Sequence, residues 1–522
     1  MLARCTTATL QGLEARQVEV EVDLGPGLPA LQMVGLADTA IHESRERLRS
    51  ALRNSGLRVP LTRVVVNLAP ADLRKEGPGF DLPIALALLV ASGQLPAGHL
   101  DGIWSAAELG LDGTLRPIRG VLPLAIAARR AGARALVVAD ANQGEAALVR
   151  GLTVWGANSL GGVLLLVDPA RPKPERRLSQ VSPTAARQPR ATPAAAEDAP
   201  DLNAVQGQQH GRRALEIAAA GEHHLLLVGP PGSGKTMLAR RLPGLLPPLN
   251  DAEALAISQI HSVAGLLPGN RGLMRNRPFR SPHHSCSAAA LIGGGANPRP
   301  GELSLAHHGV LFLDELAEFR REVLDQLRQP LDTGDIWIHR ARLQTRFPCR
   351  ITLVAATNPC PCGWHGNSDP GCSCLESSRQ RYWARLSGPL LDRLDLQVCM
   401  RPVSGSQLRC NYQDVVPDEA PESTAVVAAR VAAARERMQA RNPEGLSNGS
   451  LSSQAFRSAI RVEPDALNLW EATVQRRKLT GRGAERVLRV AQTISYLNGQ
   501  SSIDAIAVGE AIGYRSFDQN IS

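Results

Sequence analysis

The sequence predicts an α/β protein with a mixed amino-terminal domain, a phosphate-binding core and a helical carboxyl-terminal part. Three observations support this prediction. Short apolar runs alternate with helical patterns over residues 1–167. The apolar run HLLLV then leads into the glycine-rich stretch GPPGSGKT. After residue 403, apolar residues recur at helical spacing with Arg and Glu between them.

Composition and charge limit the class of protein. The chain has 522 residues, enough for about two to four domains. Hydrophobic residues make up 43% and charged residues 20%, as in ordinary globular proteins, whereas aromatic residues make up only 3%, so few side chains are available to stack on bases. The net charge of +9 and the pI of about 9.4 favour a polyanionic partner such as nucleic acid. Plain solubility is the alternative explanation of this charge.

The sequence indicates a cytoplasmic protein without membrane association. The opening MLARCTTATLQGLEARQ has no apolar segment typical of a signal peptide. The most apolar run, Leu82 to Ala91, is about half as long as a membrane span, so we expect a buried core helix there. Nine unevenly spread cysteines do not suggest a secreted disulfide framework.

In the amino-terminal region we expect strands in VEVEVDL, RVVVNLAP, ALVVADA and VLLLVD, and helices in IHESRERLRSALRNSG and LPLAIAARRAGA. Residues 168–200 are rich in Pro, Ala, Arg and Ser without periodicity, which predicts a flexible linker. A basic arm that touches nucleic acid is the alternative. We expect the nucleotide domain over 201–403 and a helical domain over 404–522.

The stretch GPPGSGKT fits the phosphate-binding loop G-x-x-x-x-G-K-[ST], between an apolar strand and the helical pattern MLARRL. Backbone N–H groups of such a loop close around phosphates, Lys235 reaches the β- and γ-phosphates, and the Thr236 hydroxyl ligates Mg²⁺. In HHGVLFLDEL, Asp314 would hold Mg²⁺ and Glu315 would polarise the attacking water. The predicted nucleotide-binding residues are Gly229, Pro230, Pro231, Gly232, Ser233, Gly234, Lys235, Thr236 and Asp314.

Three further polar residues complete the candidate catalytic set. Asn358 ends a third apolar strand, ITLVAATNPC. Arg393 lies in LSGPLLDRLDL and Arg482 in LTGRGAERVLR. An arginine beside a transferring phosphoryl group stabilises the charge of the transition state. A surface salt bridge is the alternative role for either arginine.

Longer motifs resemble a known family. The stretches FRSPHHSCSAAALIGGGANPRPGELSLAHHGVLFLDELAEF, AATNPCPCG and LSGPLLDRLDL closely resemble the magnesium-chelatase-like AAA+ ATPases of the ComM (YifB) family, and the match covers nearly the whole chain except 168–200. The resemblance implies an AAA+ P-loop NTPase core, a helical lid and a Lon-protease-like (ribosomal S5 domain 2-like) amino-terminal domain. It implies a hexameric branch-migration helicase that helps to integrate incoming single-stranded DNA during natural transformation. The implied partners are single-stranded and branched DNA passing through the ring pore, with recombination proteins as further candidates.

The resemblance also assigns roles to residues. It makes Asn358 the sensor 1 residue that orients the attacking water, and a ring would let Arg393 act on the nucleotide of a neighbouring subunit. Residues 261–305 resemble the insert of this clade, which reaches toward the pore. GDIWIHRARLQTRFPCR resembles its pre-sensor-1 hairpin, whose turn holds Arg340 and Arg342. These arginines would grip DNA phosphates, or else they face solvent or a neighbouring subunit.

Lon proteases use a Ser–Lys dyad, and this chain lacks both members. In KEGPGFDLPIALAL, Gly79 stands at the position of the nucleophile, and Leu124 stands at that of the lysine. Without nucleophile or base no acyl-enzyme forms, so we expect no peptidase activity. We favour a structural role for Lys75, and a DNA or subunit contact is the alternative.

The loop CPCGWHGNSDPGCSC holds Cys360, Cys362, Cys372 and Cys374, a set typical of tetrahedral zinc, although the C-x-C spacing departs from the commoner C-x2-C. Free thiols or a redox pair are the alternative, and His365 could replace one thiol. The cysteines elsewhere suit packing: Cys5, Cys286, Cys349, Cys399 and Cys410.

The histidine pairs 223–224, 283–284 and 307–308 make poor metal ligands, because adjacent residues of a strand point to opposite faces. His283 and His284 lie in the insert, where they are candidates for DNA contact or ring assembly.

Two other functions remain open: a chelatase-type motor that inserts a metal into a tetrapyrrole, and a protein unfoldase. A fused Lon-like domain argues against the chelatase. Stimulation of ATPase activity by DNA would favour the DNA motor, whereas stimulation by denatured protein would favour the unfoldase.

Overall fold

The computed structural model describes residues 2–168, 170, 200–267, 272–295, 298–340, 343–367, 371–402 and 421–515. The expected linker lies almost wholly outside these residues. The chain divides into two compact units: Met1–Pro193 with Asp251–Met274, and Ala194–Asn250 with Arg275–Ser522. Sequence analysis assigns residues 251–274 to the nucleotide domain, whereas their contacts group them with the first unit.

The first unit is built on a mixed sheet with the strand order β3-β4-β2-β1-β5-β8-β9. Strands β1, β2 and β4 pair antiparallel, and the remaining neighbours pair parallel. Its elements are β1 (Leu2–Gln11), β2 (Glu14–Gly25), β3 (Ala30–Val34), α1 (Thr39–Asn54), β4 (Arg63–Ala69), η1 (Pro78–Phe80), α2 (Asp81–Ala91), β5 (Ile103–Ala106), β6 (Glu108–Leu109), β7 (Leu115–Arg116), α3 (Val121–Arg130), β8 (Ala135–Ala139), α4 (Asp140–Ala146), β9 (Thr153–Ala157), α5 (Leu160–Val167) and α9 (Asp251–Ala264).

The alternation in VEVEVDL produces a strand with one buried face, as predicted. Val18, Val20 and Val22 of β2 are fully buried, and the glutamates between them point to the other face. Helix α2 fills the core beneath the sheet and is buried along its whole length, which confirms the predicted core helix. Among the described residues, no helix is long and apolar enough to cross a membrane.

The run VLLLVD is a helix, so the predicted strand there is wrong. Helix α5 covers Leu160–Val167, and the side chain of its N-cap Ser159 accepts the Gly162 N–H at 3.2 Å. A short, continuously apolar run fits a buried strand and a buried helix equally well. The N-cap serine decides between them by satisfying a backbone donor of the first turn.

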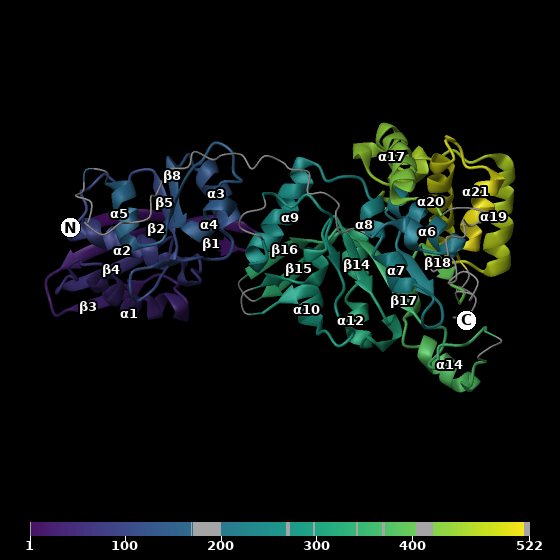
Figure 1. The fold of residues 1–522 in the computed structure, drawn as a ribbon, viewed down its shortest axis with the longest axis horizontal. Coiled ribbons are helices and arrows are strands. Elements are labelled where there is room, and N and C mark those ends of the chain that lie inside the picture. The colour runs from purple at the N-terminus through teal and green to yellow at the C-terminus, as the bar shows by residue number, and fades with distance from the viewer. Residues whose placement is uncertain are drawn as a thin grey trace, which may run out of the picture. The chain divides into compact units, whose positions relative to one another are not determined.

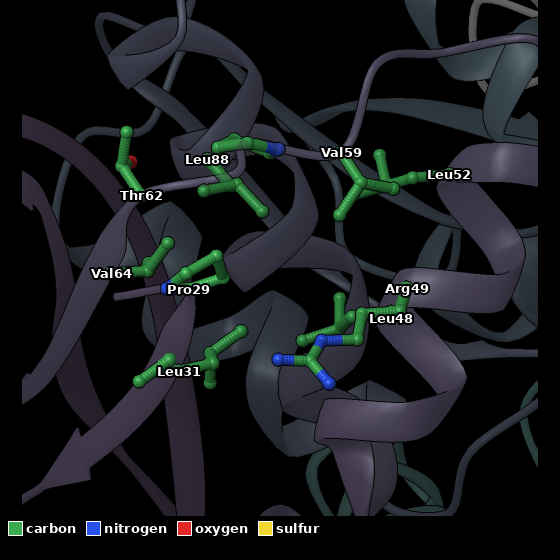
Figure 2. Close-up of a pocket in the computed structure, with 11 residues that line it drawn as sticks. Pro29, Leu31, Leu48, Arg49, Leu52, Val59, Thr62, Val64 and Leu88 are labelled. Carbon is green, nitrogen blue, oxygen red and sulfur yellow. The ribbon is translucent and has the colours of Figure 1, made fainter. Parts of the chain in front are cut away.

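An apolar pocket of the first unit lies between β3, β4, α1 and α2 (Figure 2). Leu31, Leu48, Leu52 and Leu88 contribute to its lining, together with Arg49. None of the predicted site residues lines it. We assign no function to this pocket.

The second unit contains a fully parallel sheet with the order β11-β14-β17-β10-β18. Strand β10 lies inside the sheet between β17 and β18, and the carboxyl-terminal helices α17, α19, α20 and α21 lie together (Figure 1). Before residue 300 its elements are η2 (Leu202–Ala204), α6 (Gln209–Gly221), β10 (Leu225–Val228), α7 (Lys235–Ala239), α8 (Leu242–Leu245), β11 (Phe279–Arg280), α10 (Ala288–Ile292), β12 (Gly293–Gly294) and β13 (Arg299–Pro300). Next come α11 (Glu302–Leu305), β14 (Val310–Leu313), η3 (Leu316–Glu318), α12 (Arg321–Asp325), α13 (Arg328–Thr333), β15 (Asp335–Arg340), β16 (Leu343–Pro348), β17 (Thr352–Thr357), α14 (Glu376–Trp383), α15 (Gly388–Leu391) and β18 (Leu396–Cys399). The carboxyl-terminal elements are α17 (Thr424–Arg441), η4 (Pro443–Gly445), α18 (Ser453–Ala459), α19 (Pro464–Arg477), α20 (Gly481–Leu497) and α21 (Ala505–Gly513).

A buried carboxylate stabilises the first unit. The Asp81 side chain is fully buried at the start of α2, where it accepts the Arg47 guanidinium at 2.8 Å and the Leu109 N–H at 3.2 Å. We expect Asp81→Asn to destabilise this unit by about 3 kcal/mol, because the isosteric amide leaves the Arg47 charge without its partner. Hydrogen–deuterium exchange of α1 and α2 in the full chain measures this loss.

Glu43→Gln is the matched control, since Glu43 is exposed and lies 3.9 Å from the same guanidinium. Equal exchange rates in the two variants would contradict the role of Asp81.

Candidate functional site

The predicted phosphate loop lies at the carboxyl end of β10, the strand between β17 and β18. Such an edge of a parallel sheet is where ligands bind in α/β proteins. Gly232 and Gly234 have φ angles of +76° and +86°, which only glycine adopts without strain. Beyond the two chain neighbours of each glycine, no atom of the described residues lies within 4 Å of where a Cβ would stand. The backbone of the loop is therefore accessible to a ligand at these two positions.

Lys235 links the loop to the neighbouring strand. The side chain is mostly buried, and its Nζ donates to the carbonyls of Gly229 at 2.7 Å and Pro230 at 2.9 Å. It also donates to Asn358 Oδ1 at 3.2 Å, at the end of β17. Burial lowers the pKa of Lys235, and the nearby Asp314 carboxylate opposes this shift.

The two predicted magnesium ligands lie in direct contact. The Thr236 hydroxyl donates to Asp314 Oδ2 at 2.8 Å, and Asp314 Oδ1 accepts the N–H of Glu315 at 2.9 Å. A hydroxyl and a carboxylate within one hydrogen bond of each other are the hard oxygen donors that Mg²⁺ takes alongside substrate phosphates. The residues present therefore fit a nucleotide with Mg²⁺.

Glu315 has a partner that sequence analysis did not find. Its Oε2 lies 2.9 Å from Nδ1 of His284, and Glu315 itself adopts left-handed backbone geometry. The feature from which this contact could have been predicted is the short strand β11, where Arg280 pairs with Leu311 of the parallel strand β14. Continuing that register by four residues aligns 284 with 315. The pair could have been found only if the dipeptide Phe279–Arg280 had been identified as a strand.

Two aromatic residues of α14 hold the segment that carries Asn358. The Tyr382 hydroxyl lies 3.0 Å from Thr357 Oγ1, and Trp383 Nε1 donates to the carbonyl of Pro359 at 3.0 Å. The candidate sensor residue is thus tied on both sides to a helix.

The two predicted arginines lie in different surroundings, and the contacts of Arg393 are with residues outside the phosphate loop. Arg393 is mostly buried, and its Nε donates to Asp332 Oδ1 and to the Arg328 carbonyl, each at 3.0 Å. Arg482 is exposed at the first turn of α20. Their action on a phosphoryl group stays a prediction.

The predicted hairpin is present as β15 and β16, which pair antiparallel up to Arg340 and Leu343. The backbone of Arg340 ends β15, and Arg342 lies outside the described residues. The DNA contact of these arginines stays a prediction.

The four cysteines predicted to bind metal lie together. Their Sγ atoms are all within 4.8 Å of one another, with distances of 3.3 Å for Cys360–Cys362 and 3.7 Å for both Cys360–Cys372 and Cys362–Cys372. The described His365 does not belong to this group, although its backbone N–H donates to Cys360 Sγ at 3.3 Å. The arrangement can hold a thiophilic metal through four sulfurs, Cys374 being the fourth.

Gly79 and Leu124, which the resemblance aligns with the Lon dyad, and Lys75 all lie within the packed first unit. Gly79 lies in η1, where a Cβ would stand 3.1 Å from Ile118, and Leu124 is buried in α3. Lys75 is fully buried and donates to the carbonyl of Pro70. This burial fits the structural role and leaves the ammonium no surface for a DNA contact.

The remaining histidines of the predicted pairs also form hydrogen bonds. His223 Nε2 lies 2.8 Å from Thr493 Oγ1, while His224 and His307 accept backbone N–H groups from Leu353 and Arg350. These rings thus connect strands and helices of the second unit.

Comparison with known proteins matches three family models along the chain. The model described as magnesium chelatase, subunit ChlI, matches residues 201–408. A model for subunit ChlI of Mg-chelatase matches residues 20–142, and one for the carboxyl-terminal part of that subunit matches residues 421–515.

Two relatives match nearly the whole chain, and a third matches part of it. The chain is 42% identical to the uncharacterized protein YifB of Escherichia coli, over 98% of this chain and 97% of that protein. It is 41% identical to the competence protein ComM of Haemophilus influenzae, over 97% and 96% of the two chains. The magnesium-chelatase 38 kDa subunit of Rhodobacter capsulatus is 26% identical over 33% of this chain and 54% of that subunit.

The contacts of Lys235 lead to a test of nucleotide binding. We expect Lys235→Ala to abolish ATP binding, because it removes the one ammonium group that the loop encloses. Titration with a fluorescent ATP analogue measures the affinity. Lys478→Ala, at the end of α19 in the same unit, is the control and should bind like the wild type. Unchanged affinity in Lys235→Ala would refute the assignment of the loop.

Proposed function

Because the chain belongs to the magnesium-chelatase-like family of YifB and ComM, we propose that it is an AAA+ ATPase that moves DNA. The observation that carries this proposal is the linked set of Lys235, Thr236, Asp314 and Asn358 at one edge of a parallel sheet. The similarity to a competence protein over nearly the full chain supports DNA as the substrate. The net charge of +9 favours the same polyanion.

In this proposal each residue has a defined role. Backbone N–H groups of the loop and Lys235 bind the phosphates of ATP, and Thr236 with Asp314 holds Mg²⁺, which would neutralise charge on the phosphates. Glu315 polarises the attacking water and Asn358 orients it. Arg393 and Arg482 stabilise the transition-state charge, Arg393 in a neighbouring subunit.

We propose a homo-hexameric ring in the cytoplasm, with single-stranded or branched DNA in its pore. Arg340 and Arg342 would grip the phosphates, and ATP hydrolysis would drive branch migration during the integration of incoming DNA. The amino-terminal unit would be a Lon-like domain without peptidase activity, and recombination proteins would be further partners. A chelatase-type motor is the rival, supported by the three family models.

The partner of the motor is tested by ATP turnover at two salt concentrations. We expect single-stranded or branched DNA to raise turnover, and the stimulation to weaken at higher salt, because phosphate contacts release counterions. Stimulation by denatured protein instead would indicate an unfoldase. Stimulation by a tetrapyrrole with Mg²⁺ and partner subunits would indicate a chelatase. Either result, without an effect of DNA, would refute the DNA motor.

Glu315 is tested by two substitutions with opposite effects. Glu315→Gln should bind ATP with normal affinity and hydrolyse it about a hundredfold more slowly or worse, because the amide cannot accept a proton. His284→Ala should raise basal turnover by up to about fivefold, because it frees the carboxylate from the contact with the His284 ring. Steady-state phosphate release measures both.

His283→Ala is the control, since it removes the ring that packs on His284 at a centroid distance of 4.0 Å and bonds to Ser285, but leaves the contact between His284 and Glu315 itself. Wild-type turnover in Glu315→Gln would show that another group activates the water. Slower turnover in His284→Ala would show that this bond positions Glu315 for catalysis instead of restraining it.

A further inference from the structure

The cysteine cluster has the dimensions of a metal site. Zinc–sulfur bonds of 2.3 Å in a tetrahedron place the sulfurs about 3.8 Å apart. Two of the Sγ–Sγ distances are 3.7 Å, and the Cys360–Cys362 distance is 3.3 Å. Backbone N–H groups also point at the sulfurs: Cys362 donates to Cys374 Sγ at 3.4 Å, and His365 donates to Cys360 Sγ. Such donors stabilise thiolates and orient them toward a metal.

The same loop lies directly on the phosphate-binding loop. Gly363 is buried with a φ of +87°, and a Cβ there would stand 2.7 Å from Cδ and 3.0 Å from Cγ of Pro231. The same Cβ would lie 4.0 Å from Cγ of Asn358. The Gly363 N–H closes the turn by donating to the carbonyl of Cys360 at 2.9 Å. The turn of residues 360–363, which carries two of the cysteines, is therefore packed against the loop predicted to bind phosphates.

We propose that Cys360, Cys362, Cys372 and Cys374 bind one zinc ion, and that this ion promotes ATP binding by holding Gly363 against Pro231. Four thiolates around one ion would join the stretches 360–367 and 371–374 and fix the turn at the start of the first. With the ion removed, the turn loses this restraint and Pro231 loses a fixed neighbour. The coupling rests on the proposed ATP site, whereas the metal site does not.

Metal content tests the first half of the proposal. The full chain, purified without a polyhistidine tag, should contain about one zinc per chain by mass spectrometry of the metal. Cys372→Ser and Cys374→Ser should lose it. Cys5→Ser should retain it, because Cys5 lies in β1 of the other unit, where serine keeps the contact with Ser105. Less than about half an equivalent in the wild type, or a disulfide between these cysteines, would overturn the metal site.

Gly363→Ala tests the coupling without removing a thiol. The added Cβ displaces Pro231, so this variant should keep its zinc and bind ATP about tenfold more weakly, a size typical of coupled sites. Cys372→Ser should weaken ATP binding similarly. Gly366→Ala is the control, since Gly366 has the same φ of +87° and, among the described residues beyond its two chain neighbours, no atom lies within 4 Å of its added Cβ. Wild-type ATP affinity in Gly363→Ala and Cys372→Ser would overturn the coupling.

Thermodynamic linkage between zinc and ATP binding provides an independent test on the wild-type protein. If zinc promotes ATP binding, ATP must by the same factor promote zinc binding. ATP should therefore raise the concentration of chelator needed to remove half of the zinc at equilibrium. It should have no such effect in Lys235→Ala. ATP that binds without changing zinc affinity would overturn the coupling alone, and a wild type that holds zinc but binds no ATP would overturn the proposed function alone.

Discussion

The candidate site depends on one constraint, the parallel alignment of β10, β14 and β17. Because all three strands run in the same direction, their carboxyl ends meet at one edge of the sheet. Lys235, Asp314 and Asn358 lie more than a hundred residues apart at the extremes, yet hydrogen bonds join Lys235 to Asn358 and Thr236 to Asp314. A slip of one residue in any of these strands would turn the following side chains to the other face.

A second constraint connects the carboxyl-terminal helices to this sheet. Asp395, just before β18, is almost fully buried, accepts the His224 N–H at 3.0 Å and pairs with Arg486 of α20. Burial alone would raise the pKa of Asp395, but Arg486 and His223 hold it well below its usual range. The buried charge is thus retained as a carboxylate. Arg486 also donates to the carbonyl of Arg393 at 3.0 Å, so α20 is bonded to the segment that carries the arginine predicted to reach a neighbouring nucleotide.

The sequence alone predicted the parts of the site that follow regular patterns. The phosphate loop and the apolar strands β10, β14 and β17 were predicted, because apolar runs and glycine spacing are local properties, and the β15–β16 hairpin was expected from the family resemblance. The strand expected at VLLLVD was wrong, because the segment belongs to helix α5, whose N-cap Ser159 precedes the apolar run. The contacts of Glu315 with His284 and of Gly363 with Pro231 could not be predicted, because they depend on strand register and on the path of an irregular loop.

These two unpredicted contacts fall on different steps of the proposed cycle. Gly363 touches Pro231, which belongs to the loop that would bind the nucleotide, whereas His284 touches Glu315, which would activate water. In the proposed cycle, a change in the cysteine loop would act first on the affinity for ATP, and a change at His284 would act first on turnover. The proposed ring would need these two steps to respond to different signals, because a subunit would have to hold ATP before its neighbour or the DNA permits hydrolysis. The two separate contacts would supply that independence within a single site.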